Sequence, residues 1–244
     1  MKIGLFIPCY IDQFYPQAGI ATYKLLVRLG LDVDFHTQQT CCGQPVANAG
    51  FEAYGGDALR HFADNFKRYD YIVAPSGSCV LHVKEHIGNF TEDSIGLKIK
   101  DSVFELCEFL TDIIKLENVD ATFPHKVGLH NGCHGLRGLR LARASELNIP
   151  DFNKPRSLLE KVKGIQLVEL TRRDECCGFG GTFSVTEEAI STRMGEDRLE
   201  DHLAHGAEYI TSTDTSCMMH LEGLARRRKD SVRFVHIAEI LNQQ

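Results

Sequence analysis

One cysteine pattern occurs twice in this sequence, in the same order. Each half of the chain has a lone Cys, then a Cys-Cys-Gly, then a Cys-x-x-His. The first set is Cys9, Cys41, Cys42 and Cys79, and the second set is Cys133, Cys176, Cys177 and Cys217. Because thiolates are soft ligands, two sets of four thiols predict a metal or iron–sulfur site in each half.

Other segments of the first half also recur, in order, in the second. The matches are 2–9 with 126–133, 31–35 with 165–170, 70–73 with 208–211, and 100–103 with 229–232. A duplication of about half the chain explains them, and its period is too long for a solenoid repeat. We therefore expect two similar lobes, 1–118 and 126–244, joined by a turn-prone linker at 119–125 that contains Pro124.

Within each half, short apolar runs alternate with helical patterns, which predicts βαβ units and a parallel sheet in each of two tandem α/β lobes. Ile20, Tyr23 and Leu26 share one face of a predicted helix that Gly30 ends. Ser184 and Glu187 have the spacing of a capping box that opens another helix. In open parallel sheets, ligands bind outside the carboxyl ends of the strands, so each set of thiols should converge in its own crevice.

Composition narrows the class of protein. A formal charge of −6 with 25% charged residues gives no footprint for nucleic acid. No apolar stretch approaches the roughly 18–20 residues that a transmembrane segment needs. The apolar run at 1–9 is too short for a secretory signal, so we expect a soluble protein of the cytoplasm. In that reducing compartment, a Cys-rich pattern indicates metal binding or redox catalysis more often than disulfides.

Three roles compete for the thiols. Buried apolar cysteines are common, but independent burial does not explain one order repeated twice. Structural zinc suits four thiolates, yet neither half has the usual Cys-x-x-Cys knuckles. Adjacent cysteines favour a cluster, where neighbouring thiolates bind different irons. Cys107 lies outside the pattern, and we expect it to serve only in packing.

Glycines follow the paired cysteines in both halves. They are Gly43, Gly178, Gly180 and Gly181. Such residues let backbone N–H groups approach cluster sulfurs and stabilise a reduced, more negative state. An ordinary flexible loop is the alternative for the second-half glycines.

Two stretches, Thr40–Pro45 and Glu175–Phe183, resemble the CCG-domain (cysteine-rich domain) proteins. That family includes the cysteine-rich component of heterodisulfide reductase and the iron–sulfur component of glycolate oxidase. The resemblance covers essentially the whole chain. The small two-repeat members imply a cytosolic iron–sulfur subunit of a complex that oxidises L-lactate to pyruvate. That resemblance also implies a ferredoxin-like iron–sulfur partner and a third subunit.

The chain departs from this family at one position. In the heterodisulfide reductase relatives, each motif ends in Cys-x-x-Cys and holds a non-cubane cluster with five cysteines. Here His82 and His220 stand in place of the fifth thiolate. The imidazole either ligates iron or hydrogen-bonds a thiolate. Both a 4Fe-4S cubane and a non-cubane cluster therefore stay open.

Candidates for binding a small 2-hydroxy acid lie near the second set. A lactate carboxylate needs a cation, and the nearby arginines are Arg137, Arg140, Arg172 and Arg173. His130 and His134 flank Cys133, and either could accept a proton during oxidation. A solvated surface is the alternative for each arginine. No Gly-x-Gly-x-x-Gly follows a strand, so we assign hydride or flavin chemistry to a partner.

Two rival functions remain. One is disulfide or thiol reduction at a cluster, as in the heterodisulfide reductase relatives, which the missing fifth Cys disfavours. The other is a zinc-stabilised interaction module. Clusters on exposed loops are easily lost in air, so aerobic preparation can leave zinc or an empty site.

Overall fold

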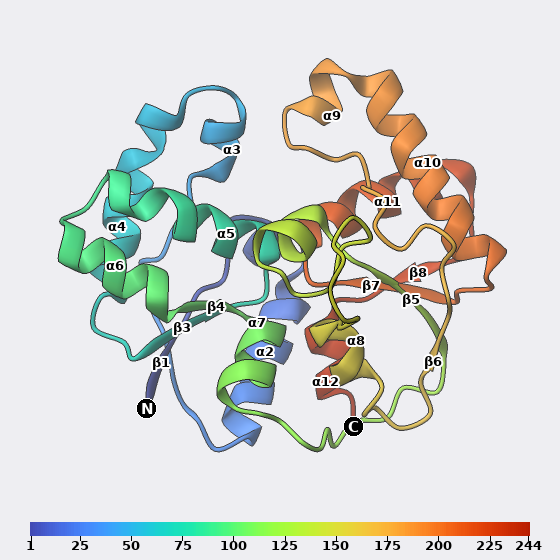
Figure 1. The fold of residues 1–244 in the computed structure, drawn as a ribbon, viewed down its shortest axis with the longest axis horizontal. Coiled ribbons are helices and arrows are strands. Elements are labelled where there is room, and N and C mark those ends of the chain that lie inside the picture. Colours follow the sequence, from blue (N-terminus) through green and yellow to red (C-terminus); the bar gives the residue numbers. More distant parts are fainter.

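A computed structural model describes all residues of the chain, 1–244. It contains two four-stranded parallel sheets, with strand orders β2-β1-β3-β4 and β6-β5-β7-β8 (Figure 1). The first sheet comprises β1 (Lys2–Leu5), β2 (Asp32–Phe35), β3 (Tyr71–Ala74) and β4 (Val103–Glu105). The second comprises β5 (Lys126–His130), β6 (Gln166–Leu167), β7 (Tyr209–Ser212) and β8 (Arg233–Phe234). The prediction of two similar α/β lobes with parallel sheets is confirmed.

Strand register shows how closely the halves correspond. Ile3 pairs with Tyr71 in the first sheet, and Val127 pairs with Tyr209 in the second. These residues occupy matching places in the repeated segments, so the duplication read from the sequence is present in the fold.

The predicted match between the last strands is wrong by two residues. Ile72 pairs with Val103 and Ile210 pairs with Phe234, so Val103 corresponds to Phe234 and not to Val232. The cause is a different connection in each half. The first half reaches β4 through α5 (Gly77–His86), η2 (Ile87–Asn89) and α6 (Asp93–Ser102), whereas the second reaches β8 through α11 (Thr215–Arg228) alone.

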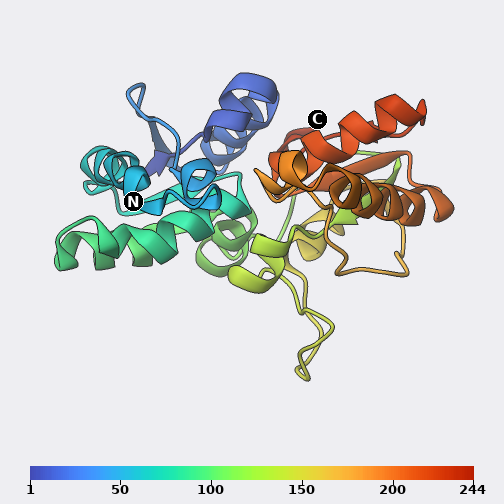
Figure 2. The ribbon, with the colours of Figure 1, turned by 90° about the horizontal axis from the view of Figure 1, so that it is seen from above.

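The remaining helices lie between the strands, except α12, which follows the last strand. In the first half they are α1 (Cys9–Phe14), α2 (Pro16–Arg28), α3 (Gln44–Asn48), η1 (Glu52–Gly55), α4 (Gly56–Phe66), α7 (Leu106–Glu108) and η3 (Phe109–Ile113). In the second they are η4 (His134–Gly138), α8 (Lys154–Leu159), α9 (Phe183–Thr186), α10 (Glu188–Ala204) and α12 (Ile237–Asn242). The connection from β5 to β6 includes an exposed excursion at 145–152, which projects from the molecule in Figure 2.

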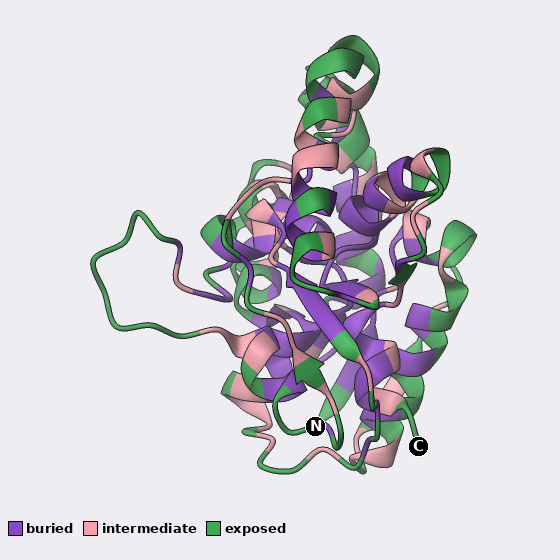
Figure 3. Cartoon of the chain, turned by 90° about the vertical axis from the view of Figure 1, so that its right-hand side faces the viewer, coloured by how far each residue is buried: buried purple, intermediate pink, exposed green.

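The two sheets share one apolar core. Helices α2, α7, α8 and α12 lie between the sheets, where α2 packs on α12 and α8 packs on both α7 and α12 (Figure 1). A single cluster of 21 buried residues includes Ile3, Leu25, Val127, Leu158 and Ile240. Figure 3 shows buried strands through the middle of the molecule. Each lobe therefore completes the core of the other.

The segment 119–125 is packed into this shared core. Ala121 and Phe123 are buried in it, and the Phe123 backbone N–H donates to the Lys163 carbonyl at 2.9 Å. The lobe boundaries at 118 and 126 stay a prediction. No helix has both the length and the apolar composition needed to cross a membrane.

Two local predictions fare differently. Gly30 follows α2 with a φ of +77°, as its place at the end of the helix predicts. The predicted apolar face is confirmed only in part, because Leu26 is buried in the core, whereas Ile20 and Tyr23 are exposed and Ala18 and Ala21 are buried in their place. The buried face of α2 therefore combines Leu25 and Leu26 with small residues.

The predicted capping box is also wrong. Ser184 lies inside α9, and its hydroxyl donates to the Gly181 carbonyl at 2.8 Å. Helix α10 begins at Glu188 with no side-chain cap. The left-handed glycines before α9 turn the chain early, so a short helix forms where the sequence predicts the cap.

Candidate metal centre

All eight cysteines of the repeated pattern lie at the carboxyl edges of the two sheets. The lone cysteines Cys9 and Cys133 come just after β1 and β5, and Cys79 and Cys217 lie in the first turns of α5 and α11. All eight line one cavity of about 290 Å³ between the lobes. The sequence predicts a separate crevice for each set, so a single shared cavity corrects that expectation.

Helices α5 and α11 bring the two edges together. Ser76 caps α5 and Asp214 caps α11, and the Asp214 carboxylate also accepts the backbone N–H of Ser78 from the other lobe at 2.7 Å. The helices thus meet by their N-termini at the cavity. Because the N-terminus of a helix is electropositive, the two helices add positive potential to the cavity beside Cys79 and Cys217.

In the first lobe, the thiols lie in contact with each other. The Sγ atoms of Cys9 and Cys41 are 3.6 Å apart, and the Gly43 backbone N–H donates to Cys41 Sγ at 3.4 Å. Hydrogen bonds from the thiols of Cys42 and Cys9 lower the pKa of Cys41 to about 2. The same contacts with Cys41 raise the pKa values of Cys9 and Cys42. The set holds one ready thiolate, and metal binding would release the remaining protons.

The second lobe repeats this arrangement. The Gly178 backbone N–H donates to Cys176 Sγ at 3.3 Å. Hydrogen bonds from Cys133 and Cys177 lower the pKa of Cys176 to about 2, and the contacts with Cys176 raise the pKa values of Cys133 and Cys177. Each lobe therefore presents the same chemistry to the cavity, a thiolate among thiols.

Glycine is required after each cysteine pair. Gly43 has a φ of +94° and Gly178 a φ of +86°, a region that side chains with a Cβ rarely adopt. A Cβ on Gly178 would also lie 2.6 Å from the Ser191 carbonyl oxygen. These two glycines supply the backbone donors to sulfur that the sequence predicts.

The later glycines lie over the cavity. Gly180 and Gly181 have φ values of +54° and +65°, and both line it. A Cβ on Gly181 would lie 3.0 Å from Asn48 Nδ2, and the Thr182 hydroxyl donates to the Asn48 carbonyl at 3.2 Å. The loop thus reaches α3 of the other lobe, and a direct contact of Gly180 or Gly181 with a cluster stays a prediction.

His82 lies behind the first set of thiols. It is 5% exposed, its Nε2 has no hydrogen-bond partner, and that atom is 3.5 Å from the Cβ position of Gly43. Burial, and then the neighbouring His86, lower the pKa of His82 to about 4. The ring is therefore neutral at pH 7.

His220 has a different environment from its counterpart. Its Nε2 is 3.3 Å from the Ser191 carbonyl oxygen and 3.5 Å from the Ser191 hydroxyl, so this ring nitrogen has its hydrogen-bond partners in α10. Burial lowers the pKa of His220. The repeated Cys-x-x-His therefore gives two histidines with unequal hydrogen bonding.

The histidines around Cys133 occupy two distinct places. His134 lines the cavity, with Nδ1 3.8 Å from Cys133 Sγ and Nε2 3.5 Å from Gln44 Nε2. His130 is buried on β5, and burial lowers its pKa to about 3. One ligand atom each from His130, Cys177 and Cys217 lie within 4.8 Å of one another. The sequence lacked any spacing signal for this group, since its members come from three separate segments.

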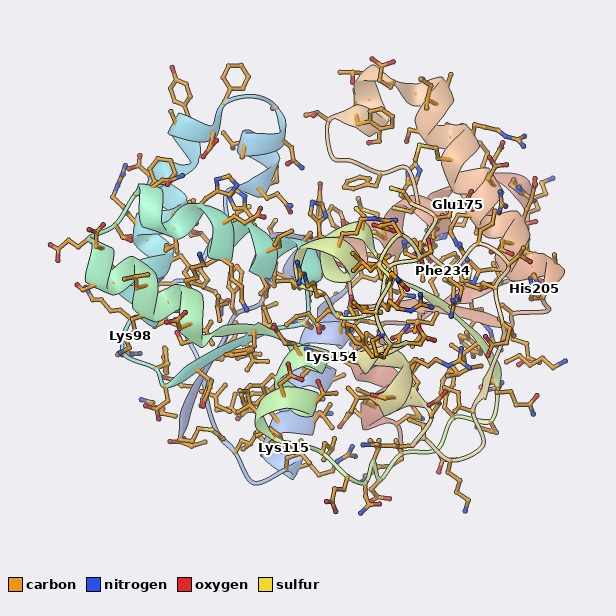
Figure 4. All side chains as sticks on the ribbon, viewed as in Figure 1. Lys98, Lys115, Lys154, Glu175, His205 and Phe234 are labelled. Carbon is orange, nitrogen blue, oxygen red and sulfur yellow. The ribbon has the colours of Figure 1, made fainter.

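The predicted arginines lie away from the cavity. Arg137 pairs with Glu146 through Nε at 2.7 Å, and Arg172 pairs with Glu175, labelled in Figure 4, through Nη1 at 3.0 Å. Arg140 and Arg173 are also exposed. No Lys or Arg is among the cavity-lining residues. A role of these arginines in substrate binding stays a prediction.

Cys107 lies apart from both sets. It is fully buried in the shared core, and burial raises its pKa well above the usual value. Its environment is that of a packing residue.

Comparison with known proteins finds relatives along the full length. The profile of a family described as "Cysteine-rich domain" (CCG) matches residues 3–84 and 127–222. Lactate utilization protein A of Geobacillus sp. (strain WCH70) is 39% identical over 248 residues, covering 100% of both chains. Lactate utilization protein A of Bacillus subtilis (strain 168) is 37% identical over 248 residues, again covering 100% of both.

A solved structure supports the fold. The crystal structure of a hypothetical protein from Helicobacter pylori superposes with a TM-score of 0.58 and 13% sequence identity. The match covers 98% of this chain and 48% of that one. At this identity the similarity shows the fold alone.

Proposed function

This chain belongs to the CCG cysteine-rich domain family, and from that premise we propose that it is the iron–sulfur subunit of an L-lactate-oxidising complex. It relays electrons through clusters held by its two sets of thiols. One observation carries the proposal: all eight repeated cysteines line a single cavity between the lobes.

The residues present suit an anionic cluster in each lobe. Each set offers four sulfurs, and backbone N–H groups of Gly43 and Gly178 already donate to sulfur. The N-termini of α5 and α11 add positive potential. When bound, a cluster supplies one-electron transfer, and either a cubane or a non-cubane form fits this donor set.

Lactate oxidation itself is assigned to another subunit. Conversion of L-lactate to pyruvate releases two electrons and two protons, and the substrate carboxylate needs a cationic partner. The cavity offers thiols, hydroxyls and the buried carboxylate of Asp214 instead. We therefore assign substrate to the third subunit, and place a ferredoxin-like iron–sulfur partner next to this chain in the cytoplasm.

Anaerobic reconstitution tests the proposal. We expect a brown protein with roughly four irons per filled site and an EPR signal on reduction. Cys42→Ala and Cys177→Ala should each lose the iron of one set. Cys107→Ala, another buried cysteine, is the matched control and should keep the iron of both sets. A colourless protein that takes up zinc and no iron would contradict the proposal.

Disulfide reduction is a second candidate. The shared cavity favours it, because a small disulfide in that space would meet both sets of thiols. Turnover of a disulfide by the isolated, iron-loaded chain would support this candidate over electron relay.

A zinc-stabilised module is the third candidate. The group of Cys177, Cys217 and His130 is also a donor set that zinc accepts. Metal analysis distinguishes this module from an electron relay, because it shows whether the bound metal is zinc, which is redox-silent, or iron.

A further inference from the structure

One of the positions at which the two lobes differ lies directly beside the thiols. Phe6 follows β1 and His130 ends β5, and each lies three residues before the lone cysteine of its lobe, Cys9 or Cys133. The registers of β1 on β3 and β5 on β7 make Phe6 and His130 equivalent. The duplication thus places an apolar ring in one lobe and an imidazole in the other.

The surroundings of these two rings also differ in polarity. Phe6 packs edge-on against Phe62 and Phe66, with ring centroids at 4.9 and 5.7 Å. His130 instead lies near the fully buried His202, at a centroid distance of 6.5 Å. A phenylalanine is satisfied by packing alone, whereas a buried imidazole needs polar partners.

His130 has no such partner within the protein. It is 2% exposed, and neither of its ring nitrogens makes a hydrogen bond. One of these nitrogens lies within 4.8 Å of Cys177 Sγ and Cys217 Sγ. A buried imidazole that has no hydrogen-bond partner and lies near two thiols is placed as a metal ligand would be.

We propose that His130 is a fifth protein ligand of the metal centre in the second lobe, and that the first lobe, with Phe6 at this position, binds its centre through thiols alone. This inference rests on the proposed function, in which both sets hold iron–sulfur clusters. The two centres are then chemically unequal. In Rieske centres an imidazole replaces a thiolate, whereas here it is added to four thiolates, so the net charge is unchanged and the extra donor lowers the potential of the second-lobe centre.

Other histidines near the thiols fit the role less well. His220 Nε2 is 3.3 Å from the Ser191 carbonyl oxygen. His82 Nε2 is unpartnered, but His82 forms no group with thiols within 4.8 Å of one another, as His130 does. His134 lines the cavity beside Cys133, and its Nδ1 is 3.8 Å from that Sγ. His134 is therefore the competitor that the experiment has to exclude.

The decisive measurement needs no substitution in its first arm. The full chain is prepared with ¹⁴N- or ¹⁵N-histidine, loaded anaerobically with iron and sulfide, reduced, and examined by pulsed electron–nuclear double resonance. We expect a strong nitrogen coupling that changes with the label. His130→Phe, which places the first-lobe residue in the second lobe, should abolish it, and His134→Asn should retain it.

A redox titration followed by EPR supplies a second readout. We expect His130→Phe, which removes the additional donor, to shift the second-lobe centre to a higher potential and to leave the first-lobe centre unchanged. Phe6→Leu, at the equivalent position, is the matched control and should shift neither centre.

The failures are distinguishable. A chain that takes up no iron overturns the proposed function and, with it, this inference. Iron uptake with a coupling insensitive to the histidine label overturns only the assignment of His130. So does a coupling that is lost in His134→Asn, and this outcome stays available if His130→Phe does not fold.

Discussion

At the scale of single residues, Gly178 carries the strictest requirement. Its φ of +86° and the 2.6 Å approach of a Cβ to the Ser191 carbonyl oxygen both exclude a side chain. We expect Gly178→Ala to cost about 1–2 kcal/mol from the backbone and a further 1–3 kcal/mol or so from the clash. Urea unfolding and iron content measure the two effects, and the iron of the second set should be lost.

Gly206 provides the control for this prediction. Its φ is +73°, but nothing lies within 4 Å of a Cβ there. Gly206→Ala should therefore show only the backbone cost and keep full iron. Equal losses in the two variants would mean that the contact with Ser191 has no role.

The cysteine ligands are predictable from sequence because their pattern is repeated and their chemistry is specific. The role of His130 is not, because an imidazole at the end of a strand has many uses. Only its burial, its lack of partners and its distance from Cys177 and Cys217 distinguish it, and these arise from tertiary structure.

At the scale of elements, the caps of α7 and α12 are equivalent but chemically opposite. Glu105 caps α7 and His236 caps α12, and in both a Glu at the third helical position completes a capping box. Both caps are fully buried. One is an acid and the other a base, so their effects on stability should depend on pH with opposite sign.

Burial raises the pKa of Glu105 to about 8. The folded chain holds this proton while the unfolded chain, with an ordinary pKa near 4.5, has released it. Stability therefore falls as pH rises from 4.5 through 8, by at most about 1.4 kcal/mol per unit. Glu105→Gln should remove this slope in urea unfolding of the metal-free, reduced protein, and an unchanged slope would contradict the prediction.

Burial lowers the pKa of His236 to about 4. Here the unfolded chain binds the proton first, so stability is present above pH 6.5 and is lost as pH falls through 4. His236→Gln should weaken that acid-side loss and leave the slope due to Glu105 intact. Each variant thus serves as the other's control, and slope changes of the same sign in the two variants would refute both assignments.

At the scale of the whole molecule, Asp214 joins the lobes. Its carboxylate caps α11 and also accepts the Ser78 N–H at 2.7 Å. Asp214→Ala should cost about 1–3 kcal/mol and loosen the contact between the helix ends. Ser76→Ala, the equivalent cap, should cost less because Ser76 bonds only within its own helix. Chemical unfolding compares them, and a larger loss in Ser76→Ala would contradict this view.

Two strongly exposed side chains suit a docking partner, and one of them, Val185, lines the cavity. Tyr54 in η1 and Val185 in α9 are 80% and 81% exposed, on elements that stand on opposite sides in Figure 1. Tyr54→Glu and Val185→Glu should weaken copurification with the ferredoxin-like partner and keep the iron content. Leu97→Glu, on α6, is the control, and equal binding by all three variants would exclude this surface.

Sequence alone predicts the two lobes and their parallel sheets, because duplication and βαβ patterns are local signals. It does not predict that the thiol sets share a cavity. That depends on the hydrogen bond that joins the N-termini of α5 and α11, and on the packing of α2 against α12. In α2, Ile20 and Tyr23 are exposed although helical spacing predicts them on the apolar face. Contacts between the lobes join residues far apart in the chain, so they produce no periodic pattern in the sequence.

The helices between the sheets have a further consequence. Helix α2 corresponds to α8 and α7 to α12, so exchanging the halves turns the α2–α12 contact into the α8–α7 contact. This is the reciprocity of an isologous dimer interface. The two halves of the chain therefore contact each other as the two subunits of a homodimer would, but within one polypeptide. We expect a half expressed alone to expose this apolar surface and to dimerise with a second copy of itself. In the fused chain, by contrast, a residue can change in one half only, whereas in a homodimer every change occurs in both subunits.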